Sequence, residues 1–300
     1  MSADSEFNLS ISPFSKKLMT PFFAMVKYKY YVRRMETKTL AIVGCGKLAN
    51  IVLDAFIKGL LPDYRLIGTY SRTFENAENI AKKIQSLNRG YDCTPCHSLN
   101  ELLHLQPDYI VETASPSSLK ELAVPALKNG SSIVTLSIGA FADEEFYKLV
   151  AQTAAENGTR VHLASGAIGG FDVLRTVSLM EKSEVSFETK KGPNSLKNTE
   201  IYEEGLQTEA RQVFEGNAAE AICLFPTRVN VAVAAALAST GPENIKVSIN
   251  SVPNFVGDNH RIEINSKQIS AVIEVYSQTA QIAGWSVVNT LRNITSPIVF

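Results

Sequence analysis

The sequence predicts an α/β protein in which a doubly wound parallel sheet is followed by a second, mixed α/β domain. Two observations carry this prediction. Between residues 39 and 164, short apolar runs alternate with amphipathic helical segments, which is typical of βαβ crossovers and a sheet covered on both faces. After Ser165 the strand-like segments alternate in polarity, which indicates a sheet with one open face.

The expected elements follow in order. Apolar runs that suit buried parallel strands lie at residues 39–43, 65–70, 108–113, 132–137 and 160–164. Segments with apolar residues at helical spacing lie at residues 47–61, 74–87, 118–128 and 143–157. In the second half, strands are expected at 184–191, 246–252, 260–264 and 271–276, and helices at 216–224, 227–239 and 279–291. This order predicts one domain at 38–164, a second at 165–277, and a C-terminal helix within 278–300 that packs back on the first.

The first 37 residues differ from the rest in composition. From Phe7 to Arg34 there are six basic residues and no acidic one, as in an organelle transit peptide, although Asp4 and Glu6 precede them. Two interpretations stay open: a poorly ordered leader on a cytoplasmic protein, and a mitochondrial targeting segment.

Bulk composition excludes several classes of partner. The formal net charge is −1, so no strong field attracts nucleic acid or anionic lipid. The small-apolar stretch at 229–238 is too short to span a bilayer. Four cysteines are too few for a disulfide scaffold of this length. We therefore expect a protein of a reducing compartment with no nucleic-acid or membrane partner.

The pair Cys93 and Cys96 has the spacing of half a zinc site. Only His97 and His104 lie nearby, and neither gives the usual spacing of a second ligand pair. We interpret the segment as a short strand with two small apolar side chains and expect no metal.

A glycine pattern, Gly44-Cys45-Gly46-Lys47-Leu48-Ala49, follows the first strand and opens the first helix. Gly44 permits a tight turn, Gly46 lets the backbone approach a pyrophosphate, and the small Ala49 lets helix and strand pack closely. Because strand and helix flank the pattern where a dinucleotide site requires them, we predict a Rossmann-type domain that binds NAD or NADP.

The end of the second strand bears on the choice between these cofactors. NAD enzymes usually place an acid there for the ribose hydroxyls, but residues 68–72 read Gly-Thr-Tyr-Ser-Arg. The guanidinium of Arg72 is suited to a 2′-phosphate, so we expect NADP to be accepted. Alternatively, Arg72 stacks on the adenine or faces solvent.

Two further features lie beyond the first domain. Residues 165–172 form a glycine-rich junction with free backbone N–H groups for an anion or a nicotinamide, unless the segment is a plain hinge. His260 shares a strand face with Ile262 and Ile264, so its imidazole is expected to point inward. Alternation alone does not show whether His260 is a catalytic histidine or a structural histidine of the core. We interpret the other three histidines, His97, His104 and His162, as structural.

Four motifs that occur in the same order resemble the L-aspartate dehydrogenase family. They are GAIGGFD at 166–172, FEGNA at 214–218, FPTRVNVA at 225–232, and the pair Asn259-His260 on a strand. The resemblance runs from about Thr39 to the C-terminus. It implies a Rossmann domain joined to a mixed α/β catalytic domain that also forms a homodimer. It further implies that Ala167 and Asn230 contact the cofactor and that His260 is the catalytic residue.

The implied reaction is the reversible, NAD(P)-dependent oxidative deamination of L-aspartate to iminosuccinate, which water converts to oxaloacetate and ammonia, in amino-acid metabolism or NAD biosynthesis. Lys191 or the 165–170 loop is a candidate holder of the second substrate carboxylate. The chain departs from the family in having Gly192 after its basic pair, and Gln278 and Ala280 where lysine and serine are frequent. Two alternatives stay open. One is a related two-domain oxidoreductase that shares the Rossmann half, such as a homoserine dehydrogenase or a member of the sugar oxidoreductase group; the other, which the changes at Gln278 and Ala280 keep open, is a non-catalytic NADP(H)-binding sensor.

Overall fold

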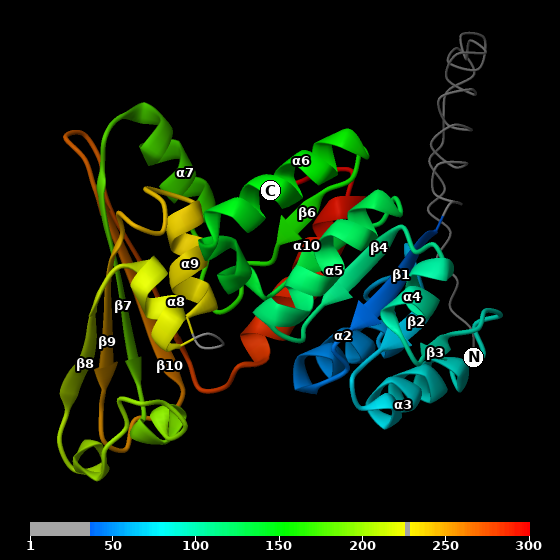
Figure 1. Ribbon diagram of the computed structural model, residues 1–300, viewed down its shortest axis with the longest axis horizontal. Coiled ribbons are helices and arrows are strands. Elements are labelled where there is room, and N and C mark those ends of the chain that lie inside the picture. Colours follow the sequence, from blue (N-terminus) through cyan, green and yellow to red (C-terminus); the bar gives the residue numbers. More distant parts are fainter. Residues whose placement is uncertain (1–36, 226–228) are drawn as a thin grey trace, which may run out of the picture. The chain divides into compact units, whose positions relative to one another are not determined.

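The computed structural model describes residues 37–225 and 229–300 (Figure 1). Apart from Thr37, the expected leader lies outside these residues, as do positions 226–228. Residues 38–300 form one compact unit that contains two sheets.

The first sheet is parallel and has six strands in the order β3-β2-β1-β4-β5-β6. Its strands are β1 (Lys38–Val43), β2 (Tyr64–Tyr70), β3 (Thr94–Cys96), β4 (Tyr109–Glu112), β5 (Ser132–Thr135) and β6 (Val161–Leu163). This is the strand order of a doubly wound dinucleotide-binding fold, and the order reverses between β1 and β4. Ligands of such sheets bind outside the carboxyl ends of the strands at this reversal.

Helices cover both faces of this sheet. They are α2 (Lys47–Ile57), α3 (Phe74–Gln85), α4 (Leu99–His104), α5 (Pro116–Lys128) and α6 (Glu144–Glu156). Alternate residues of β1 belong to separate apolar cores: Leu40 packs with residues of α2 and α3, whereas Ala41 packs with residues of α5 and α6. The two-sided burial explains why the first strand is apolar from Leu40 to Val43. The short helix α4, capped by Ser98, was not predicted, because six residues show too little periodicity.

The second sheet is mixed and has the strand order β11-β10-β7-β9-β8. Its strands are β7 (Glu184–Lys191), β8 (Arg211–Gly216), β9 (Lys246–Ser251), β10 (Asp258–Asn265) and β11 (Ser270–Ser277). Only the β7–β9 pair is parallel. Alternate residues of β7, β9 and β10 are buried, as the sequence predicts for a sheet with one covered face. The edge strand β8 was not predicted.

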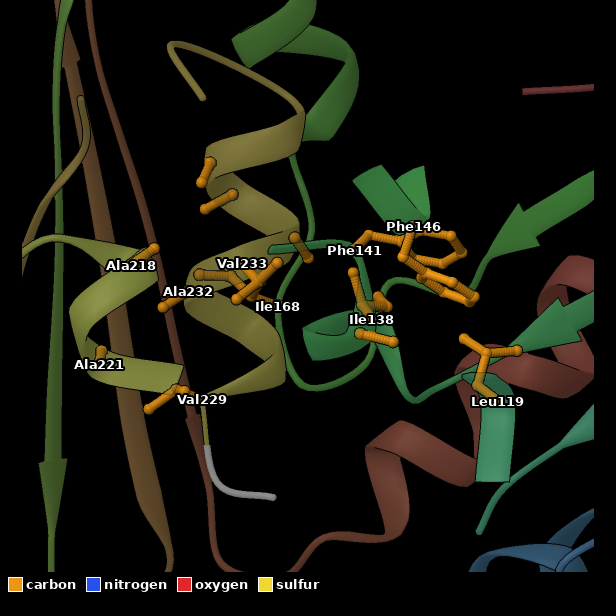
Figure 2. Close-up of a cluster of buried hydrophobic side chains, with 14 of the residues drawn as sticks. Leu119, Ile138, Phe141, Phe146, Ile168, Ala218, Ala221, Val229, Ala232 and Val233 are labelled. Carbon is orange, nitrogen blue, oxygen red and sulfur yellow. The ribbon is translucent and has the colours of Figure 1, made fainter. Parts of the chain in front are cut away.

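Three helices lie on the covered face of the second sheet: α7 (Phe171–Met180), α8 (Ala218–Leu224) and α9 (Asn230–Leu237) (Figure 1). Figure 2 shows Ala218 and Ala221 on α8 and Ala232 and Val233 on the neighbouring α9, with Val233 beside Ile168. Apart from Asn230, helix α9 is apolar on every side because it packs between α8 and the short 3₁₀ helix η2 (Ile138–Ala142).

The last helix, α10 (Gln281–Thr295), packs against α2. A Cβ atom on Gly284 would lie 2.6 Å from Ile51 Cδ1, so glycine permits this close approach. The Ser286 hydroxyl of α10 also accepts a hydrogen bond of 3.0 Å from the Gly166 amide. The C-terminal helix therefore fixes the segment that leads into α7.

Candidate functional site

The turn between β1 and α2 has the geometry that the glycine pattern predicts. Gly44 has a φ of +90°, and a Cβ atom there would lie 2.6 Å from the amide nitrogen of Ala114. Around Gly46, in contrast, nothing lies within 4 Å of the position of a Cβ atom. Ala49 is fully buried and so serves helix packing. No described side chain caps α2, and its first turn contains no acid. The first N–H groups of α2 are thus suited to a pyrophosphate.

Arg72 lies two residues beyond the end of β2 and is exposed. Thr73 is the N-cap of α3 but makes no capping hydrogen bond with its side chain. The first acid after β2 is Glu75, inside α3. This end of the strand therefore presents a guanidinium and a helix N-terminus, and both are suited to a phosphate.

Glu112, at the carboxyl end of β4, is a site residue that the sequence did not reveal. Its side chain is fully buried. One oxygen, Oε1, accepts hydrogen bonds from the amides of Ala114 (2.8 Å) and Ser115 (3.0 Å) and from the Ser137 hydroxyl (2.9 Å). The other oxygen, Oε2, accepts one from the Thr135 hydroxyl (2.6 Å).

These four donors join the ends of two adjacent strands to the start of α5. Burial raises the pKa of Glu112, and the hydrogen bonds oppose this effect. The same loop contacts the glycine turn, because the Thr113 hydroxyl donates to the Gly44 carbonyl oxygen at 2.8 Å. Glu112 therefore fixes the wall of the predicted cofactor site opposite α2.

The glycine-rich loop before α7 was expected to offer free backbone N–H groups, but other parts of the chain constrain it. The amide of Gly166 is already bonded to Ser286, as described above, so it is not available to a ligand. Gly170 has a φ of +75°, and a Cβ atom there would lie 2.6 Å from Ile273 Cγ1. Ala167 lies between these glycines in a turn and is half-buried.

Asn230 is the first residue of α9 and links this helix to the segment that follows β5 of the first sheet. Its Oδ1 accepts a hydrogen bond of 2.8 Å from the amide of Gly139, in η2. A Cβ atom on Gly139 would lie 2.8 Å from this oxygen and 2.6 Å from Ile222 Cδ1. The side-chain oxygen thus holds the main chain beyond β5, and within the described residues the Nδ2 group donates no hydrogen bond.

His260 lies on the covered face of β10, as alternation predicts, and is only 3% exposed. Its ring stacks on Phe187, with the centroids 5.7 Å apart. Nδ1 is buried and has no hydrogen-bond partner in the described part of the chain. Burial, aided by the positive charge of Lys191 and opposed by Asp258, lowers the pKa of His260 to about 4. At neutral pH the imidazole is therefore uncharged and able to accept a proton.

Lys191 lies on the same face of the neighbouring strand. It is paired with Asp258 in the β7–β10 ladder, and Nζ lies 2.9 Å from Oδ1 of Asp258. The lysine side chain is 9% exposed, and the aspartate side chain 32%. The structure thus brings His260 and Lys191 together, two candidates that sequence reasoning had placed separately.

The predicted residues consequently form two groups. Gly44, Gly46, Ala49 and Arg72 lie at the carboxyl edge of the first sheet, and Lys191 and His260 lie on the covered face of the second. Neither group contains Asn230 or Gly166. These residues instead join the segments around the two groups, because the Gly139 amide donates a hydrogen bond to Asn230 and the Gly166 amide donates one to Ser286.

Within the described part of the chain, no three His, Cys, Asp or Glu residues converge as metal ligands would. Cys93 and Cys96 are free and buried, and Cys96 ends the short strand β3. No described helix combines the length and the apolar character needed to cross a membrane.

Two family models together match most of the chain. Residues 44–164 match the model described as the NAD binding domain of homoserine dehydrogenase. Residues 172–294 match the model described as the C-terminal part of aspartate dehydrogenase. The cofactor of the first domain is accordingly NAD or NADP.

Individual proteins agree with these models. An L-aspartate dehydrogenase of Methanococcus maripaludis strain C6 is 31% identical over 270 residues, which covers 86% of this chain and 97% of that protein. The one of Methanocaldococcus jannaschii is 28% identical with the same coverage. The crystal structure of aspartate dehydrogenase from Thermotoga maritima superposes with a TM-score of 0.68 at 28% identity, covering 88% of this chain and 99% of that one. A hyperthermophilic archaeal homoserine dehydrogenase, at 14% identity and a TM-score of 0.57, shares the fold.

Proposed function

Because the chain belongs to the L-aspartate dehydrogenase family, we propose that it oxidises L-aspartate with NAD or NADP to iminosuccinate, which water converts to oxaloacetate and ammonia. The observation that carries this proposal is the uncharged imidazole of His260, buried beside the ammonium group of Lys191 on one sheet face. A base and a cation in this arrangement suit a substrate that must lose an amine proton while its carboxylate is held.

Each group has a defined task in this proposal. The turn at Gly44 and Gly46 and the N-terminus of α2 hold the pyrophosphate. The bound nicotinamide cofactor supplies the hydride acceptor. His260 takes a proton from the substrate amine as the Cα–H bond breaks and a C=N bond forms. His260 also assists the addition of water to the imine carbon, after which ammonia leaves and oxaloacetate remains.

For the cofactor, we propose that NADP(H) binds at least as well as NAD(H). The support is local: the segment after β2 contains the exposed Arg72 and no acid before Glu75.

For assembly, we propose a homodimer formed through the second domain. Its edge strand β11 has two side chains, Val272 and Tyr276, that are 50% and 52% exposed, and tyrosine is enriched at interfaces between subunits.

Steady-state kinetics on the purified chain test the main proposal. Oxaloacetate with ammonia, and L-aspartate in the reverse direction, should turn over faster than any other substrate in a panel of amino acids and hydroxy acids, with both cofactors. Turnover of homoserine or another hydroxy acid, with none of aspartate or oxaloacetate, would reject it. Cofactor binding without turnover of any substrate would identify a binding protein instead.

A further inference from the structure

The covered face of the second sheet changes character toward one end. Where β7, β9 and β10 pair in the middle of the sheet, this face is apolar, with Phe187, Val247 and Ile262 in register. Toward the carboxyl end of β7 the inward residues become polar. His260 is paired with Thr189, and in the last row Lys191 is paired with Asp258 on one side and Ser251 on the other.

These polar side chains are as buried as the apolar ones. Thr189 is 1% exposed and Ser251 is fully buried. Among residues 37–225 and 229–300, the hydroxyl oxygens of both residues and the Nδ1 atom of His260 have no hydrogen-bond partner. Buried polar atoms in proteins are nearly always hydrogen-bonded, so each exception requires an explanation. Three exceptions in two successive rows of the sheet, one of which contains the partly buried Lys191–Asp258 ion pair, indicate that a ligand completes the set.

We propose that Thr189, Lys191 and Ser251 form the subsite for the side-chain carboxylate of a four-carbon dicarboxylic amino acid. This inference rests on the proposed function and deepens it, because it names the groups that select a dicarboxylate. Asp258 is a positioning residue that acts through Lys191.

The donors on this face fit a carboxylate. An ammonium group has three N–H donors, and Asp258 takes one from Lys191 at 2.9 Å. The remaining N–H groups and two hydroxyls are donors, and an ionised carboxylate is a pure acceptor with two oxygens. A substrate hydroxyl in this place would leave most of the donors unpaired. Because the carboxylate is charged, its hydrogen bonds are of the stronger kind.

Thr189→Val replaces the hydroxyl by a methyl group of similar size, and Ser251→Ala deletes the hydroxyl. With saturating NADP⁺, we expect each variant to raise KM for L-aspartate and the Kd of succinate about 10-fold or more, as for a lost hydrogen bond to a charged group. kcat and the Kd of NADPH should stay within about two-fold of wild type. Succinate is the binding probe because it has both carboxylates but no amine to oxidise.

Thermal unfolding supplies a readout that a structural role would not give. In the ligand-free protein these hydroxyls are unpaired, so their removal should leave Tm unchanged or raise it. The matched control is Ser131→Ala, which deletes another fully buried hydroxyl without a partner, before β5 in the first domain. It should behave like the two variants in Tm and like wild type in KM and succinate binding.

The outcomes separate the two proposals. If wild type oxidises aspartate and both variants keep the wild-type KM and succinate Kd, or lose Tm and kcat together, the subsite is refuted and the function stands. If wild type binds succinate through these hydroxyls but oxidises another substrate, the function is refuted and the subsite stands. Weaker succinate binding with unchanged or higher Tm supports the subsite.

Discussion

His260 should make the folded protein less stable at acidic pH, and replacing it by a residue that cannot be protonated should remove this part of the pH dependence. The perturbation is His260→Gln, which keeps a polar side chain but cannot be protonated. Burial, assisted by Lys191, lowers the pKa of His260 from 6.5 to about 4. The folded state therefore binds fewer protons than the unfolded chain between these two values.

The size and sign of the effect follow from that difference. The stability that depends on the uncharged imidazole is fully present above pH 6.5 and is lost as the pH falls toward 4. Over the whole interval, from 6.5 to about 4, the loss is about 3 kcal/mol at about 1.4 kcal/mol per pH unit. About 2 kcal/mol of it should be lost by pH 5, where the unfolded imidazole is already mostly protonated.

Urea unfolding at pH 7.5 and pH 5 measures this directly. Between these conditions, wild type should lose about 2 kcal/mol more stability than His260→Gln. The control is His104→Gln, because His104 is exposed, and it should follow wild type. Other buried groups such as Glu112 contribute equally to all three proteins and cancel in the comparison. An identical pH dependence in wild type and His260→Gln would show that the imidazole is not held uncharged by the fold.

Four further predictions concern the site itself. His260→Ala should fold and bind cofactor but lose kcat by about 10²–10⁴-fold, and near-normal turnover would return the residue to a structural role. Arg72→Ala should weaken NADPH binding far more than NADH binding in calorimetry; equal losses would mean that Arg72 does not contact the 2′-phosphate. Glu112→Gln places an amide NH₂ or a weaker acceptor among four donors, so urea unfolding should show a loss of about 1–3 kcal/mol, accompanied by weaker cofactor binding. Gly44→Ala adds a Cβ atom 2.6 Å from Ala114 at a φ of +90° and should raise the Kd of both cofactors, whereas an unchanged Kd would show that the turn adjusts freely.

Sequence patterns predicted the features that are local in the chain. The strand at 184–191 and the inward direction of His260 follow from alternation over a few residues, and the turn at Gly44 follows from one short motif. The charged edge strand β8 was missed because its six residues, RQVFEG, do not alternate, and its register shifts between Gln212 and Phe214.

The missed site residues depend on contacts between distant segments. Glu112 is satisfied by hydroxyls 23 and 25 residues further on, and Gly166 by Ser286, 120 residues away. Thr189 and Ser251 resemble ordinary members of alternating strands. Alternation places Thr189 on the same face as Lys191, two residues further on, but only the sheet register brings Ser251 of β9 beside Lys191. No short motif encodes such pairings, so they required the fold.

The proposed carboxylate subsite, formed by Thr189, Lys191 and Ser251, also bears on how a base with so low a pKa takes part in proton transfer. In the ligand-free protein, the charge of Lys191 and burial both keep His260 unprotonated. A substrate carboxylate at Lys191 offsets that positive charge, so its arrival removes one of the two causes and raises the pKa of the imidazole. We infer that the base is uncharged before the substrate binds and becomes a better proton acceptor once the carboxylate is in place. A substrate without the second carboxylate would leave the charge of Lys191 in place, and His260 would stay a weaker base. The subsite would therefore select the dicarboxylate in the chemical step as well as in binding.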